Sequence, residues 1–141
     1  MSHQRIRNIG GRIACVAALA TALVAGSPTA SALAGTAAVD WSASHQSGSA
    51  TGTSSTSYSG LFKTVSVTGT LTSASTDCYR LQLVVQRDLA VQFIDVAEQC
   101  GTGSTPATAG SSGMTVTTSF SVRVCRVVSG SVTGCGATVP V

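Results

Sequence analysis

Four cysteines constrain the fold of this chain more than any other feature of its sequence. They are Cys78, Cys100, Cys125 and Cys135. Each consecutive pair brackets alternating apolar residues with a turn signal between them, which is the pattern of a β-hairpin. Opposed residues of an antiparallel pair lie close enough for a disulfide to join them. Of the three connectivities that four cysteines allow, we therefore expect the two hairpin disulfides Cys78–Cys100 and Cys125–Cys135.

A basic and then apolar segment precedes these cysteines. Three arginines are followed by the apolar run 13–25 and by small residues, which is the pattern of a secretory signal peptide. The apolar run is short for a membrane span. The sequence thus predicts that residues 1–34 are a signal peptide, cleaved after Ala34 or, as a second candidate, after Ala32. A fifth cysteine, Cys15, would leave with this leader, so that an even number remains.

The rest of the chain, residues 35–141, carries no net formal charge. Its cations are Lys63, Arg80, Arg87, Arg123 and Arg126, and its acidic residues are Asp40, Asp77, Asp88, Asp95 and Glu98. Nucleic-acid binding needs a cationic surface, so no nucleic-acid partner is expected. Four paired cysteines suit an oxidising compartment. We therefore expect a single secreted, extracellular domain with no membrane span after the leader is cleaved.

Strand-forming residues dominate this domain. Valine and threonine favour strands, and serine and glycine favour turns. Period-two alternation predicts strands near residues 62–71, 78–87, 89–100 and 114–128. The expected fold is an all-β antiparallel β-sandwich of immunoglobulin-like size, with a small β-barrel as the alternative. Residues 35–59, rich in Ser, Thr and Gly, are expected to be a polar strand or a mobile segment. Residues 101–113 are expected to be an exposed, mobile loop.

The first hairpin allows a more detailed prediction. If Leu89 is the centre of the turn, Cys78 faces Cys100 and Arg80 faces Glu98, an oppositely charged pair. The same register places Asp95 on the apolar face of the hairpin. A β-bulge would re-aim this carboxylate, so the role of Asp95 stays open.

Several short motifs resemble those of a group of exported proteins. The motifs are VSVTGTL at 65–71, DCYRLQL at 77–83, QCGTG at 99–103, SVRVC at 121–125 and GCG at 134–136. With these motifs the chain resembles small secreted actinobacterial β-sandwich proteins of uncharacterised function. The resemblance covers residues 40–137. It implies a β-sandwich fold and export, and it supplies no catalytic residues.

Patterns of catalytic or cofactor-binding residues are missing from residues 35–141. His45 is the only histidine there, and it has no G-x-S-x-G serine or other evident partner. The sequence contains no P-loop and no metal-ligand motif. We therefore expect a protein that is not an enzyme and that holds no cofactor and no metal.

Binding is the remaining class of function. Trp41 and Tyr58 lie in the least regular segment and are the candidate ligand-binding residues, as a platform for a sugar ring. The other aromatic residues are expected in the core: Phe62, Tyr79, Phe93 and Phe120. The leading hypothesis is a non-enzymatic binding or surface-associated module, whose partner is a cell-wall polysaccharide or a secreted protein. The alternatives are an extracellular protease or glycosidase inhibitor that uses the loop at 101–113, and a carbohydrate-binding module.

Overall fold

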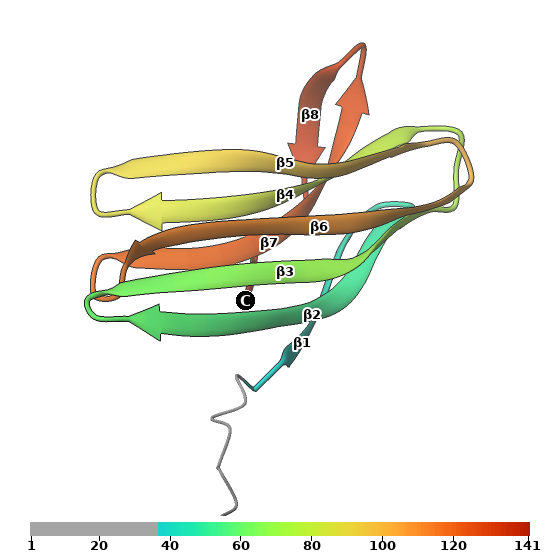
Figure 1. Ribbon diagram of the computed structural model, residues 1–141. Helices are drawn as coiled ribbons and strands as arrows, with labels where there is room; N and C mark the ends of the chain where they lie inside the picture. The colour runs from blue at the N-terminus through green and yellow to red at the C-terminus, as the bar shows by residue number, and fades with distance from the viewer. Residues whose placement is uncertain (1–36) are drawn as a thin grey trace, which may run out of the picture. The chain divides into compact units, whose positions relative to one another are not determined.

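The computed structural model describes residues 37–141, which form two antiparallel β-sheets packed face to face (Figure 1). In the order of its strands, the first sheet contains β1 (Val39–His45), β2 (Gly48–Ser59), β3 (Phe62–Ser73) and β6 (Gly103–Met114). The second contains β5 (Ala90–Cys100), β4 (Cys78–Arg87), β7 (Thr118–Val128) and β8 (Ser131–Cys135). The short strand β9 (Val139–Pro140) also pairs with β7. The predicted β-sandwich is confirmed, whereas the predicted signal peptide and both cleavage sites lie outside the described residues.

The core lies between the inner faces of the two sheets. Alternate residues of each strand point inward, as the period-two pattern requires. The large inward residues are Trp41, Val65, Val67, Leu71, Tyr79, Leu81, Leu83, Val85, Phe120, Val122 and Val124. No helix in residues 37–141 is long and apolar enough to cross a membrane.

Trp41 is the largest residue of this core, and small residues make room for it. Along the first sheet Trp41 pairs with Gly52, Gly52 with Gly69, and Gly69 with Ala107. A Cβ atom on Gly52 would lie 2.6 Å from the indole carbon Cζ2, and one on Gly69 would lie 2.9 Å from the same atom. The indole therefore packs directly against the backbone of two neighbouring strands. Both glycines are needed because each leaves the space that a side chain would fill.

Two segments for which the sequence suggests mobility are ordered strands in the structure. Residues 39–59 form β1 and β2, so the polar-strand alternative for this segment is correct. The predicted mobile loop at 101–113 is wrong, because 103–114 is the edge strand β6 and pairs with β3 along its whole length. Small residues point inward, and the outward positions are Ser104, Pro106, Thr108, Gly110, Ser112 and Met114. Pro106, which has no amide hydrogen, is tolerated because an edge strand leaves one side unpaired.

The two hairpin disulfides form as predicted. Cys78 is bonded to Cys100 and Cys125 to Cys135, and each pair occupies opposed positions of its hairpin. The register of the first hairpin shifts by one residue at a bulge next to Leu81. The shift leaves Val96 without a partner and pairs Asp95 with Gln82 instead of Leu83. The carboxylate of Asp95 is thus directed to the outer, solvent-facing side.

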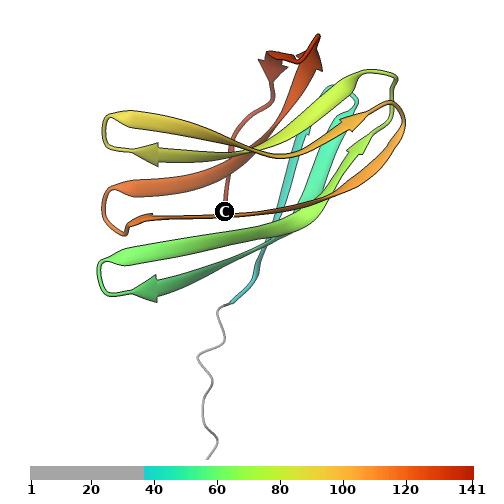
Figure 2. The same ribbon diagram turned by 45° about the horizontal axis from the view of Figure 1, so that its top comes forward.

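Three turns lie together at one end of the sandwich, two of them in hairpins and one between the sheets. They join β2 to β3, β4 to β5 and β6 to β7, and they lie at the left in both views (Figures 1 and 2). The turns are short and comprise residues 60–61, 88–89 and 115–117. Each is held by long strands that belong to the packed sheets. This end of the molecule therefore presents three adjacent turns on a rigid base.

Candidate functional site

Most of the exposed large apolar side chains of the described residues gather around these three turns. The apolar tip surface consists of Tyr58, Leu61, Phe62, Leu89, Met114 and Val116. Three of its members lie in the turns themselves: Leu61 is 72% exposed, Leu89 104% and Val116 85%. Single exposed apolar residues are ordinary, whereas clusters of them mark interaction sites. The apolar tip surface is therefore the leading candidate for a binding site.

Hydrogen bonds join two of the three turns directly and link the β4–β5 hairpin to the neighbouring strand. The amide of Thr115 donates to the carbonyl oxygen of Leu61 at 2.8 Å, and its hydroxyl donates to the same oxygen at 3.1 Å. The guanidinium of Arg87 donates to the carbonyl oxygen of Ser112 at 3.3 Å, which links the β4–β5 hairpin to β6. The three turns are therefore held in one arrangement.

An open cleft of about 540 Å³ lies among the same turns. Its walls include the apolar side chains of Phe62, Leu89 and Met114, together with the polar residues Arg87 and Asp88. A mostly apolar cleft with a few polar groups is the usual form of a ligand site. The cleft extends the apolar tip surface inward between the two sheets.

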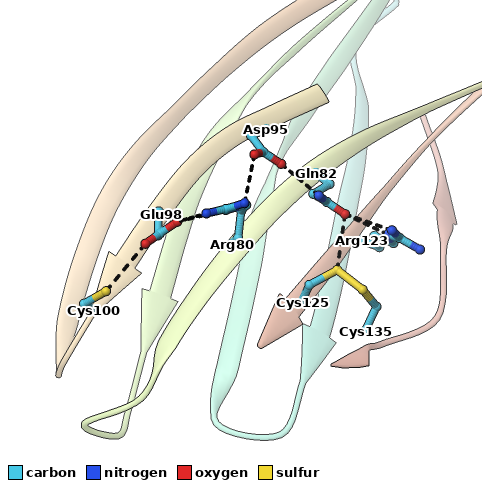
Figure 3. Close-up of polar contacts among 8 residues, drawn as sticks. All are labelled: Arg80, Gln82, Asp95, Glu98, Cys100, Arg123, Cys125 and Cys135. Carbon is cyan, nitrogen blue, oxygen red and sulfur yellow. Dashed lines mark hydrogen bonds and ion pairs between the residues drawn. A yellow bond between two sulfur atoms is a disulfide. The ribbon is translucent and has the colours of Figure 1, made fainter. Parts of the chain in front are cut away.

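A second surface of interest is a polar network on the outer face of β4, β5 and β7 (Figure 3). Arg80 bonds both Glu98, at 2.5 Å, and Asp95, at 2.9 Å. The amide of Gln82 donates to Asp95 at 2.8 Å, and its oxygen accepts from Arg123 at 2.9 Å. The predicted pairing of Arg80 with Glu98 is confirmed, and Asp95 is one of its two anionic partners.

The polar side chains of this outer-face network are bonded to one another, so none of them requires a ligand as a partner. The hydrogen bond to Glu98 raises the pKa of the Arg80 guanidinium, burial opposes the rise, and the charge of Asp95 adds to it. The Phe93 ring covers the guanidinium of Arg123, whose central carbon lies 4.1 Å from the ring centre. Phe93 and Phe62, which the alternation predicted for the core, are therefore both on the surface, while Tyr79 and Phe120 are buried. The network binds three strands together and leaves few polar groups free.

The two predicted ligand-binding aromatics are not brought together. Trp41 is buried, with 4% of its surface exposed, whereas Tyr58 is 68% exposed. The nearest exposed aromatic to Tyr58 along the hairpin is Phe62, which pairs with Ser59. Because successive residues point to opposite faces of a strand, Tyr58 and Phe62 flank the first sheet on different sides. No flat aromatic platform for a sugar ring results.

His45 ends β1 and lies beside Gly134. Within residues 37–141 its imidazole has no hydrogen bond to a serine or a carboxylate, so the described part contains no triad built on it. One group of metal-ligating residue types does occur there, formed by Cys78, Glu98 and Cys100. Its two sulfur atoms are bonded to each other, so they are not thiolate ligands.

The sequence did carry a signal for the apolar tip surface. Turn positions favour Gly, Asn, Asp and Ser, yet the three turns contain Leu61, Leu89 and Val116. Alternation alone had placed Met114 and Val116 in one strand with Phe120. In the structure β6 ends at Met114, and residues 115–117 turn the chain into the other sheet.

Comparison with known proteins does not assign the chain to a family. No protein-family model matches the chain, and neither a curated protein nor a solved structure is significantly similar to it. The resemblance to small secreted actinobacterial proteins therefore stays a prediction.

Proposed function

We propose that this chain is a secreted, non-enzymatic binding module whose binding surface is the apolar tip surface. One observation carries the proposal: three neighbouring turns, two of them hydrogen-bonded to each other, each present a solvent-exposed aliphatic side chain at one end of the sandwich. Loops at the end of a β-sandwich are a common place for binding sites, because the sheets hold them rigidly. The two disulfides support an oxidising compartment.

The two alternative functions have less support. An inhibitor was expected to use residues 101–113 as a reactive loop, and most of these residues are the paired strand β6. A sugar-binding platform was expected to contain Trp41, whose indole packs inside the core. The proposal for the apolar tip surface depends neither on a reactive loop at 101–113 nor on an exposed Trp41.

The proposal predicts a large effect from three substitutions. Complete burial of a Val, Leu or Phe side chain contributes about 1.5–3 kcal/mol. Even at the lower limit, Leu61, Leu89 and Val116 would together contribute about 4.5 kcal/mol. The variant L61S/L89S/V116S should therefore bind its target about two thousand-fold more weakly.

The test measures retention of the disulfide-bonded protein, expressed with its own leader, on three target classes. These are lipid vesicles, insoluble cell-wall polysaccharide and immobilised secreted hydrolases. The matched control V39S/V128S/V132S removes three exposed aliphatic side chains elsewhere. We expect one class to retain the wild type and the control but not L61S/L89S/V116S. Retention on none of the three, or equal retention of both variants, would contradict the proposal.

A further inference from the structure

Three aliphatic side chains of the apolar tip surface project from its turns, and one of them, Leu89, also lines the cleft. Leu61, Leu89 and Val116 stand on three separate turns, and nothing around Leu89 reduces its exposure below 104%. A rigid protein partner would need three matching cavities to bury such side chains. The interfacial layer of a lipid bilayer closes around each of them without a preformed shape, as it does around the apolar face of an interfacial helix.

The cations of the molecule favour the same end. Arg80 and Arg126 pair with carboxylates, and the guanidinium of Arg123 is held by Gln82 and the Phe93 ring. Among residues 37–141 the other two cations, Lys63 and Arg87, have no carboxylate partner, although Arg87 donates hydrogen bonds to Gln92 and to the carbonyl oxygen of Ser112.

Both of these cations lie directly behind the turns. Lys63 follows Phe62, and its ammonium lies 5.3 Å from the centre of the Phe120 ring, while Arg87 lines the cleft. Asp88 is the one acidic residue among the described turns at this end, which leaves the end with a net positive charge. The remaining described residues have three cations and four carboxylates. The molecule is thus cationic at the end where its apolar side chains are exposed.

A tyrosine completes the pattern. Tyr58 lies two residues before the β2–β3 turn, with its ring exposed behind Leu61. Tyrosine rings gather where a bilayer meets water, because one part of the ring is apolar and the hydroxyl is polar. Tyr58 and Lys63 are opposed in the β2–β3 pair, so the aromatic ring and a cation both lie behind the aliphatic side chain of Leu61.

We propose that the apolar tip surface docks on the surface of an anionic lipid bilayer and inserts Leu61, Leu89 and Val116 below the headgroups. Lys63 and Arg87 then lie at the level of the headgroup phosphates. This inference rests on the proposed function and names its partner. The sandwich itself stays outside the bilayer, as in peripheral membrane binding.

The experiment uses vesicles of phosphatidylcholine with and without phosphatidylglycerol. The variant L89W places an indole at the tip, and V132W places one on the distant β7–β8 hairpin. We expect the fluorescence of L89W to shift to shorter wavelength with anionic vesicles, and that of V132W to stay unchanged. The variant K63Q/R87Q should partition about 30-fold more weakly, because each cation near an anionic surface contributes about a factor of five. Added salt should weaken binding of the wild type in the same direction. Circular dichroism confirms that each variant is folded.

The outcomes separate this inference from the proposed function. No vesicle binding, together with tip-dependent retention on polysaccharide or a hydrolase, would overturn the lipid inference and leave the binding module intact. Vesicle binding that L61S/L89S/V116S retains would overturn both. A dimer of the free protein in sedimentation, lost in that variant, would show that the tip surface is covered by a second copy and would overturn the lipid inference alone.

Discussion

Gly69 provides the sharpest test of how the core accommodates its tryptophan. The substitution G69A adds a Cβ atom that would lie 2.9 Å from Cζ2 of Trp41 and 3.0 Å from Cα of Gly52. It would also come closer still to the carbonyl oxygen of Thr51. Neither the buried indole nor the neighbouring backbone can move without disturbing the sheet.

The expected cost follows from that crowding. Overpacking a well-packed core by one methyl group typically costs about 1–3 kcal/mol. Because backbone atoms of the adjacent strand are involved, we expect a value near the upper limit, about 3 kcal/mol. For a domain of this size the melting temperature should fall by about 12–24 °C. Urea unfolding followed by circular dichroism, with both disulfides intact, measures the free energy of unfolding and also serves variants that lack Trp41.

A matched glycine supplies the control. Gly110 lies on β6 and faces outward, where an added Cβ would meet its nearest atom at 3.4 Å. An alanine there is accommodated and reduces the freedom of the unfolded chain, so G110A should change stability by less than about 1 kcal/mol. In the double variant W41F/G69A the smaller ring should recover part of the loss, with a coupling energy of at least about 0.5 kcal/mol. If G69A proves as stable as G110A, the packing argument for Trp41 is wrong.

Two further predictions concern the second sheet. In the chain-entropy model, loops of 22 and 10 residues give the disulfides about 3.4 and 2.7 kcal/mol, so C78A/C100A should lose more stability in urea than C125A/C135A. The reverse order would show that the loops are already restricted in the unfolded chain. Gln82 is buried and joins Asp95 to Arg123, so Q82M should cost about 1–2 kcal/mol in urea unfolding. An unchanged midpoint would show that water replaces its hydrogen bonds.

The fold could be predicted largely because it depends on local patterns. The alternation of apolar residues, the turn residues and the positions of the cysteines all lie within single hairpins, so each can be identified from the sequence. The edge strand β6 was missed because its outward residues are Ser, Thr, Gly and Pro, the same residues that form loops. Only its pairing with β3, thirty to fifty residues away, makes it a strand. The bulge at Val96 is only an alternative at the level of sequence, because a one-residue shift costs little locally and is decided by where Asp95 finds its partners.

The candidate site was harder to predict because it depends on three segments that are distant in the sequence. Nothing near Leu61 indicates that Leu89 and Val116 lie beside it. Their proximity follows from strand order, which no local pattern contains. The sequence led instead to Trp41, because a lone tryptophan in a polar segment resembles an exposed anchor. The two glycines that receive its indole lie on other strands, so its burial also depended on strand pairing.

The composition of the three turns argues that folding alone did not select them. No turn conformation requires Leu61, Leu89 or Val116, and none of the three contributes to the core. Exposed aliphatic side chains at turn apices lower solubility and increase the risk of aggregation. A polar residue at each position would satisfy the turn equally well. A residue that is unfavourable for its local structure and gains nothing in packing is expected where function requires that residue. The same preference is broken at three turns, which the topology brings to one end beside two cations that have no carboxylate partner. The binding surface is therefore placed there and not on the more elaborate network around Arg80.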